Sequence, residues 1–407
     1  MKAMATSVLV VAVAVVAAAV AARGGEALFS HDGLVAPESG KWEFQASDAK
    51  DGMVYNPFEG AFPDKGGRLV SPPIALPQPA GEGGYYHLTF SAESAQRAFQ
   101  GVDYYDAAGK LLPDNYDVVY PGKQAYDRTF FAMPETVSIR LFFQSGKPFK
   151  VVDVKVEKAD AAAAAAYGDA VYATVPPLAF KAPADAFAKL PKTRAAMHEG
   201  RPWRVVMLGD SNSQDLFHSQ FHALVKREFP KSDLRVLVSV RGSTGVAYYA
   251  DPGQFKAYVA DQKPDLLIIG GATNFRCNQK PEEVAAWLDT VIRRAKDELG
   301  CEVLVCTPMV AMDSRAADKE KPDAPIPPAA WTRETDFWAK QTYFPEQMAK
   351  VAEANAVAFW DFTATAYGYL FASGKPHGWF SRDDYHNGER GKQIAGRIFL
   401  ECFKTAK

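Results

Sequence analysis

The sequence lacks an excess of basic residues. Its 407 residues include 46 Lys and Arg against 48 Asp and Glu, so the formal net charge is −2. A protein that neutralises nucleic-acid phosphates needs clustered positive charge, and this chain has no surplus of it. The composition therefore argues against nucleic acid as a partner.

Long apolar runs are absent after the N-terminus. The one run, Val8–Ala22, follows Lys2 and is shorter than the ~20 residues that a bilayer-spanning helix needs. Small residues at Ala19–Ala21 offer a cleavage sequence, and no cysteine nearby could carry a lipid anchor. The pattern predicts a signal peptide over residues 1–21 and an exported protein, secreted or periplasmic, with no stable membrane insertion after cleavage.

Cysteines are few, and all of them fall in the C-terminal half: Cys277, Cys301, Cys306 and Cys402. The N-terminal half therefore has no disulfide to stabilise it and depends on its hydrophobic core. The cysteine spacing matches neither CxxC metal knuckles nor a thioredoxin motif, and four cysteines can pair in three ways. We expect buried thiols, and a single disulfide between two of them stays an alternative. We expect neither a metal nor an organic cofactor.

Hydrophobic residues make up 48% of the chain, and its length predicts two or three domains. Residues 28–158 contain short alternating or β-branched runs separated by turns. This pattern predicts an all-β sandwich. The expected strands are Lys41–Ala46, Tyr85–Ala92, Phe99–Tyr105, Arg128–Met133, Ser138–Gln144 and Phe149–Glu157.

Residues 159–201 differ in composition, with an alanine run at Ala161–Ala166 followed by scattered prolines and aromatic residues. A connection this long is usually more than slack, so we predict a linker or strap that docks on the following domain.

Residues 202–407 alternate apolar runs with segments of helical period. Five strands are expected, of which Arg204–Leu208 is the first, and an expected helix over Ser213–Phe229 follows it. Continuous apolar strands joined by helices predict a parallel sheet that is covered on both faces. Ligands of such sheets bind beyond the carboxyl ends of the strands.

Candidate hydrogen-bond donors follow three of these strands. Ser211 lies in the turn after the first strand, Gly242 follows the second and Asn274 follows the third. The Ser211 and Gly242 N–H groups and the Asn274 amide could form a three-donor oxyanion hole. Taken singly, they would be an N-cap serine and ordinary turn residues.

Asp383 and His386 stand three residues apart before the last helix. In a helical turn this spacing puts both side chains on one side, where the carboxylate orients the imidazole and the imidazole takes the Ser211 proton. Asp384 has the wrong spacing. Asp361 is an alternative acid, and His377 is a competing base without an acidic partner at i−3.

Two further features have ordinary explanations beside their functional ones. His218 and His222 are spaced like a zinc pair, but Ser219 stands where HExxH proteases carry their general base. We therefore expect plain core or surface histidines. Five tyrosines of the sandwich could stack on sugar rings or belong to a core; they are Tyr104, Tyr105, Tyr116, Tyr120 and Tyr126.

Ser211, Gly242, Asn274 and His386, with Asp383 in an Asp-x-x-His block, resemble the SGNH, or GDSL, hydrolase superfamily in their order. One departure is Phe275, where many members have Asp. The resemblance covers 202–407 and implies a flavodoxin-like sheet and a serine hydrolase. The sandwich in front resembles, in pattern alone, jelly-roll modules of carbohydrate esterases.

The resemblance implies an exported serine esterase that removes small acyl groups, acetyl above all, from a carbohydrate through an acyl-enzyme. A glycan O-acyltransferase would use the same residues. A non-catalytic glycan-binding protein is a third possibility. The proline-rich insertion at 307–332 is expected to overhang the site.

Overall fold

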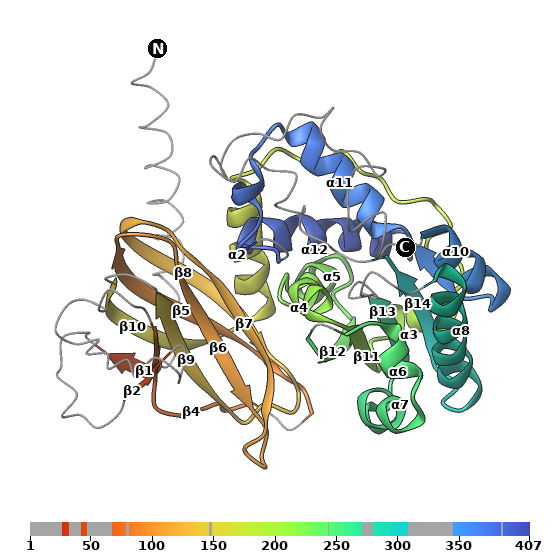
Figure 1. Ribbon diagram of the computed structural model, residues 1–407, viewed down its shortest axis with the longest axis horizontal. Coiled ribbons are helices and arrows are strands. Elements are labelled where there is room, and N and C mark those ends of the chain that lie inside the picture. The colour runs from red at the N-terminus through yellow and green to blue at the C-terminus, as the bar shows by residue number, and fades with distance from the viewer. Residues whose placement is uncertain are drawn as a thin grey trace. The chain divides into compact units, whose positions relative to one another are not determined.

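The computed structural model describes residues 27–31, 42–46, 67–78, 81–145, 149–242, 244–270, 280–307, 345–383 and 386–407 (Figure 1). They form two compact units, the first ending at Ala170 and the second containing Val171–Lys407. The predicted signal peptide lies outside the described residues, as does the predicted insertion beyond Thr307. No helix in the described part of the chain is long and apolar enough to span a membrane.

The first unit contains two antiparallel sheets. One sheet has, in spatial order, strands β1 (Ala27–His31), β10 (Phe149–Ala159), β5 (Gly84–Ser94) and β8 (Gly122–Ala132). The other has β2 (Glu43–Ala46), β3 (Gly67–Val70), β9 (Ser138–Ser145), β6 (Ala98–Tyr105) and β7 (Leu111–Val119), with the short β4 (Ile74–Ala75) paired to β9.

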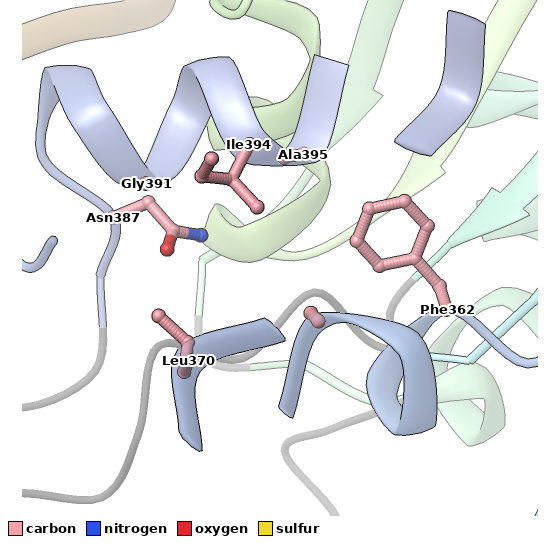
Figure 2. Close-up of a pocket in the computed structure, with 7 residues that line it drawn as sticks. Phe362, Leu370, Asn387, Gly391, Ile394 and Ala395 are labelled. Atoms are coloured by element: carbon pink, nitrogen blue, oxygen red, sulfur yellow. The ribbon is translucent and has the colours of Figure 1, made fainter. Parts of the chain in front are cut away.

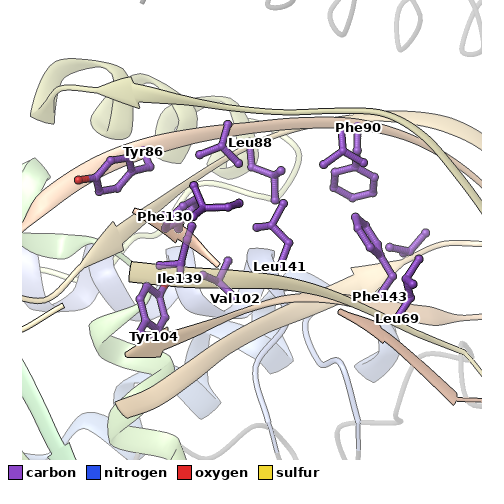
Figure 3. Close-up of a cluster of buried hydrophobic side chains, with 14 of the residues drawn as sticks. Leu69, Tyr86, Leu88, Phe90, Val102, Tyr104, Phe130, Ile139, Leu141 and Phe143 are labelled. Atoms are coloured by element: carbon purple, nitrogen blue, oxygen red, sulfur yellow. The ribbon is translucent and has the colours of Figure 1, made fainter. Parts of the chain in front are cut away.

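The inner faces of the two sheets share one hydrophobic core (Figure 3). Alternate residues of β5 are buried, including Leu88 and Phe90, as their period of two requires. From the opposite sheet, Leu141 and Phe143 join them, and the Phe90 and Phe143 rings meet edge to face at 5.2 Å. The predicted β-sandwich is confirmed.

Strand β7 was missed in the sequence because Pro113, Asp114 and Asn115 have the composition of a turn. Among the described strands, β7 lies at the edge of its sheet and pairs with β6 alone. A proline is tolerated at an edge because no further strand needs its missing N–H.

The second unit is built on a five-stranded parallel sheet. Its spatial order is β12-β11-β13-β14-β15, which is the flavodoxin-like order 2-1-3-4-5. The predicted α/β fold is therefore confirmed. The strands are β11 (Pro202–Gly209), β12 (Asp233–Val240), β13 (Leu266–Gly270), β14 (Glu302–Cys306) and β15 (Ala358–Trp360).

Two groups of helices flank this sheet (Figure 1). One contains α4 (Ser211–Phe217), α5 (Phe221–Glu228) and α12 (Glu389–Lys404), and the other contains α6 (Val246–Ala250), α8 (Pro281–Asp297) and α10 (Pro345–Ala354). Other helices of this unit include α7 (Pro252–Tyr258) and α11 (Phe362–Ser373), with the short η2 (Ala260–Gln262) and η5 (His377–Trp379).

The helix predicted over Ser213–Phe229 is divided in two. Gln220 has a φ of 56°, in the left-handed region, and separates α4 from α5. A left-handed residue cannot continue a right-handed helix, so the chain changes direction there.

The cysteines of the described region are free and buried: Cys301, Cys306 and Cys402. Burial raises the pKa of the Cys301 and Cys402 thiols to about 12, so both stay protonated and unreactive near neutral pH. Cys277 lies outside the described residues.

The segment predicted to be a linker contains two helices, α2 (Ala161–Tyr172) and α3 (Pro191–Glu199). The alanine run forms α2 because alanine has the highest helix propensity, and the Asp160 carboxylate accepts the Ala163 N–H at 2.7 Å at its start. Composition suggested a spacer because a run of one small residue shows no apolar stripe.

The C-terminal part of this segment belongs to the core of the second unit. Phe187 and Leu190 are buried, and the Trp360 indole N–H donates to the Ala186 carbonyl at 2.9 Å. Tyr369 donates its hydroxyl proton to the Pro176 carbonyl at 2.7 Å. Residues 171–201 are therefore an integral part of the second unit.

The start of α3 is bound by a carboxylate from the central sheet. Glu302, on β14, accepts the N–H groups of Lys192 and Thr193, each at 2.7 Å. It also accepts the Thr193 hydroxyl at 2.6 Å. Because Glu302 is buried, removing α3 would leave its charge without these donors.

We expect a protein truncated to begin at Arg201 to be unstable, and one truncated to begin at Val171 to unfold cooperatively. The chain that begins at Arg201 exposes the apolar surface that Phe187 and Leu190 cover. It also lacks the hydrogen-bond donors that α3 supplies to Glu302. Thermal melting followed by circular dichroism compares the two. Equal melting temperatures would contradict the assignment of residues 171–200 to this unit.

Candidate active site

The first site residue lies in the turn that joins β11 to α4. The Asp210 side chain, fully buried, caps α4 by accepting the Asn212 N–H at 2.9 Å. Ser211 is consequently the first residue of the helix, and it is partly exposed. The N-cap role belongs to Asp210, so the Ser211 hydroxyl is not needed to cap the helix.

Gly209 allows this turn to lie tightly against the next strand. Its φ is +156°, and a Cβ at this position would collide with the Gly270 carbonyl oxygen and the Ser213 Oγ. A residue with a side chain would push β11 away from β13. The glycine before Asp210 thus holds the serine turn close to the sheet.

Asp383 and His386 lie on the loop 380–388, which precedes α12. An antiparallel bridge between Ser381 and Asn387 closes this loop. Inside it, the His386 N–H donates to Asp383 Oδ1 at 2.9 Å. Two residues of the expected helical turn, 384 and 385, lie outside the described residues. The bridge and this local hydrogen bond bring the Asp383 and His386 side chains together.

Three side chains form a continuous series of contacts. His386 Nδ1 lies 2.8 Å from both Oδ1 and Oδ2 of Asp383, and His386 Nε2 lies 2.8 Å from Ser211 Oγ. With the imidazole proton on Nδ1, the ring donates a hydrogen bond from Nδ1 to the carboxylate. Its Nε2 then accepts a hydrogen bond from the serine hydroxyl. The arrangement is that of a nucleophile, a general base and an orienting acid.

Of the competing candidates, Asp361 has contacts elsewhere in the structure. Asp361 caps α11, where its Oδ1 accepts the Ala364 N–H at 3.2 Å and the Thr307 hydroxyl at 3.1 Å. His377 falls in η5, and its side chain is outside the described residues. Asp384 is also outside them.

The two histidines spaced like a zinc pair are core residues. The His218 and His222 rings contact the Phe217 ring, with centroids 4.9 and 6.1 Å apart. Burial lowers the pKa of His222 to about 3, so its ring is neutral near pH 7. Among the described residues, no three His, Cys, Asp or Glu side chains come together in a way that could hold a metal ion.

Of the predicted oxyanion donors, Gly242 lies in an exposed turn after β12, and Asn274 is outside the described residues. The turn is tied to the serine turn through its neighbour, because the Arg241 N–H points to the Gly209 carbonyl at 3.3 Å. Tyr249 joins the same two segments: its hydroxyl donates to the Gly209 carbonyl and accepts the Arg241 N–H at 2.9 Å.

Tyr249 was not among the residues predicted from the sequence. Burial raises its pKa, so the phenol keeps the proton that it donates to Gly209. Nothing in the sequence distinguishes it from the adjacent Tyr248, because its role depends on contact with a different strand.

A small pocket lies beside the loop 380–388, between α11 and α12 (Figure 2). Its lining is apolar apart from one amide, and consists of Phe362, Ala366, Leu370, Asn387, Gly391, Ile394 and Ala395. Asn387 directly follows His386. The loop that carries the imidazole thus borders an apolar space.

Residues 207–394 match the model of the GDSL-like lipase/acylhydrolase family. The matched range begins in β11, before Ser211, and ends in α12, after His386. The second unit therefore contains a GDSL-like acylhydrolase domain over these residues. Its serine, aspartate and histidine stand in the order that the SGNH resemblance implied.

Several solved structures resemble part of this chain. A two-domain esterase active on acetylated mannans has 15% sequence identity and a TM-score of 0.42, over 54% of this chain and 53% of its own. A lipase/acylhydrolase from Enterococcus faecalis has 17% identity and a TM-score of 0.34, over 49% of this chain and 93% of its own. The match thus spans about half of the mannan esterase. No curated protein matches the sequence.

Proposed function

We propose that this protein is a serine esterase that works through an acyl-enzyme, with Ser211 as nucleophile, His386 as general base and Asp383 as the acid that orients it. The observation that carries the proposal is the series of 2.8 Å contacts from the Asp383 carboxylate through the His386 ring to Ser211 Oγ. A serine on a sharp strand-to-helix turn next to a base is an arrangement that supports acyl transfer.

The chemistry follows from these contacts. Ser211 Oγ attacks the ester carbonyl while His386 Nε2 takes its proton, and Asp383 stabilises the imidazolium that results. The N–H groups of Ser211 and Gly242, with the Asn274 amide, are the proposed donors to the oxyanion. His386 then protonates the departing alcohol. A water molecule, deprotonated by His386, cleaves the acyl-enzyme and regenerates Ser211.

For the substrate, we propose small acyl groups, acetyl above all, carried by a carbohydrate. Support comes from the predicted export and from a β-sandwich in front of the hydrolase domain. Of the five tyrosines considered for sugar stacking, Tyr104 is buried in the sandwich core, and Tyr126 stacks on Phe90 at 4.7 Å. Tyr104 is a core residue and Tyr126 packs against the core, so the sandwich as a sugar-binding module rests on Tyr105, Tyr116 and Tyr120.

The test is to incubate the protein with an activated acetyl ester and, separately, with an acetylated polysaccharide. Intact-mass spectrometry should detect one acetyl group on Ser211 during turnover, and acetate should be released from the polysaccharide. A sugar acceptor added to the reaction distinguishes transfer from hydrolysis by the mass of the products. If no activated ester acylates Ser211, the esterase proposal is wrong and the glycan-binding alternative returns.

A further inference from the structure

A buried ion pair joins the helix of Ser211 to the loop of His386. Asp215, on α4, contacts Arg382 of the loop with Oδ1 and Nη1 2.5 Å apart. Their side chains are only 1% and 3% exposed. Asp215 lies four residues, about one helical turn, after Ser211, and Arg382 directly precedes Asp383.

The same carboxylate holds the other end of the loop segment. Asp215 Oδ2 accepts the N–H of Asn387, the residue after His386, at 2.7 Å. Arg382 Nη1 also donates to the Asn387 carbonyl at 2.6 Å. One aspartate on α4 therefore binds the residue before Asp383 and the residue after His386.

Two backbone hydrogen bonds within this loop have a different effect. The Arg382 N–H donates to the His386 carbonyl at 3.0 Å, and the Gly388 N–H donates to the Phe380 carbonyl at 2.8 Å. These contacts close the loop on itself, whereas Asp215 joins it to the helix that carries Ser211.

Stability alone is a poor explanation for such a pair. Removing two charges from water costs several kcal/mol per ion, and well-packed apolar residues often give equal or greater stability. What a buried ion pair with additional hydrogen bonds supplies is fixed geometry, because charge-assisted hydrogen bonds are short and directional. Here the fixed geometry is that of the Asp383–His386 segment relative to the first turn of α4.

We propose that Asp215 and Arg382 are positioning residues that hold His386 Nε2 within hydrogen-bond reach of Ser211 Oγ. The inference rests on the proposed function, since it assigns the pair to the reaction of Ser211. A misplacement of about 1 Å in reacting groups can cost about 10²-fold in rate, so a loosened loop should slow turnover with little effect on binding.

The first variant is Asp215→Asn in the full-length protein, which keeps the shape of the side chain and removes its charge. With a small activated ester we expect kcat to fall by about 10²-fold and KM to change by less than about threefold. The rate at which a fluorophosphonate labels Ser211 should fall in parallel, because labelling needs the same Ser211–His386 contact. All rates are measured well below the melting temperature of the variant.

A matched control is available in the first unit. The buried Asp103 forms an ion pair at 2.6 Å with Arg68, whose side chain is 27% exposed, on one sheet of the sandwich. Asp103→Asn removes a comparable charge, and we expect it to leave kcat and the labelling rate unchanged. A second experiment uses Arg382→Ala. Adding guanidinium ion to the buffer should partly restore the activity of this variant.

The outcomes separate the two proposals. If the wild-type protein neither hydrolyses esters nor is labelled, the proposed function fails. If the wild-type protein is active while folded Asp215→Asn keeps its kcat within about threefold, the positioning role is wrong. Should Asp215→Asn fail to fold, the double variant Asp215→Leu/Arg382→Met leaves no charge unpaired. Low kcat in that folded protein supports the inference, and wild-type kcat overturns it.

Discussion

Replacing Ser211 with alanine should abolish ester hydrolysis in a protein that remains folded. The hydroxyl is the proposed nucleophile, and its loss should lower kcat/KM by about 10⁴- to 10⁶-fold. Stability should change little, because Ser211 is partly exposed and Asp210, not Ser211, caps the helix. The measurement is hydrolysis of an activated acetyl ester, with thermal melting of both proteins alongside.

Ser213 provides the matched control, two residues further along α4. It is buried, and its Oγ lies close to Gly209 and Gly270. Ser213→Ala should therefore keep activity within about tenfold of wild type. If Ser211→Ala also kept activity within about tenfold of wild type, Ser211 would not be the nucleophile. Ser213 or another reaction class would then have to be considered.

Asp383→Asn should reduce kcat by about 10²- to 10⁴-fold, while Asp384→Asn should have a small effect. Both carboxylate oxygens of Asp383 lie 2.8 Å from His386 Nδ1. An asparagine amide there would remove the charge that stabilises the imidazolium and can favour the wrong ring tautomer. The adjacent aspartate makes a paired comparison possible, with kcat of both variants measured across the same pH range.

Equal and small losses in the two aspartate variants would mean that the enzyme works with a Ser–His dyad or takes its acid from Asp361. The second explanation conflicts with the contacts of Asp361, whose carboxylate caps α11 and accepts the Thr307 hydroxyl. Adding Asp361→Asn to the series decides between the two, because only the second explanation predicts a large loss from it.

The fold was predictable where the pattern is local. Alternation along β5 and continuous apolar strands such as β11 reflect burial on one face or on both, which the sequence records residue by residue. Prediction failed where local composition and structure disagree, as in β7, with its turn-like Pro113, and in α2 and α3, which lie in a segment with the composition of a linker.

The chemistry-bearing residue types and their order were readable in the sequence, because Ser211 and His386 stand just after or before regular elements. Tertiary structure alone decided how they meet: Ser211 and His386 are 175 positions apart. It also decided the loop geometry around Asp383 and the role of Tyr249. The ion pair of Asp215 with Arg382 and its hydrogen bond with Asn387 likewise depend on tertiary structure. Propensity acts over a few neighbouring residues, whereas these contacts exist only because the packed sheet and helices bring distant segments within hydrogen-bond distance.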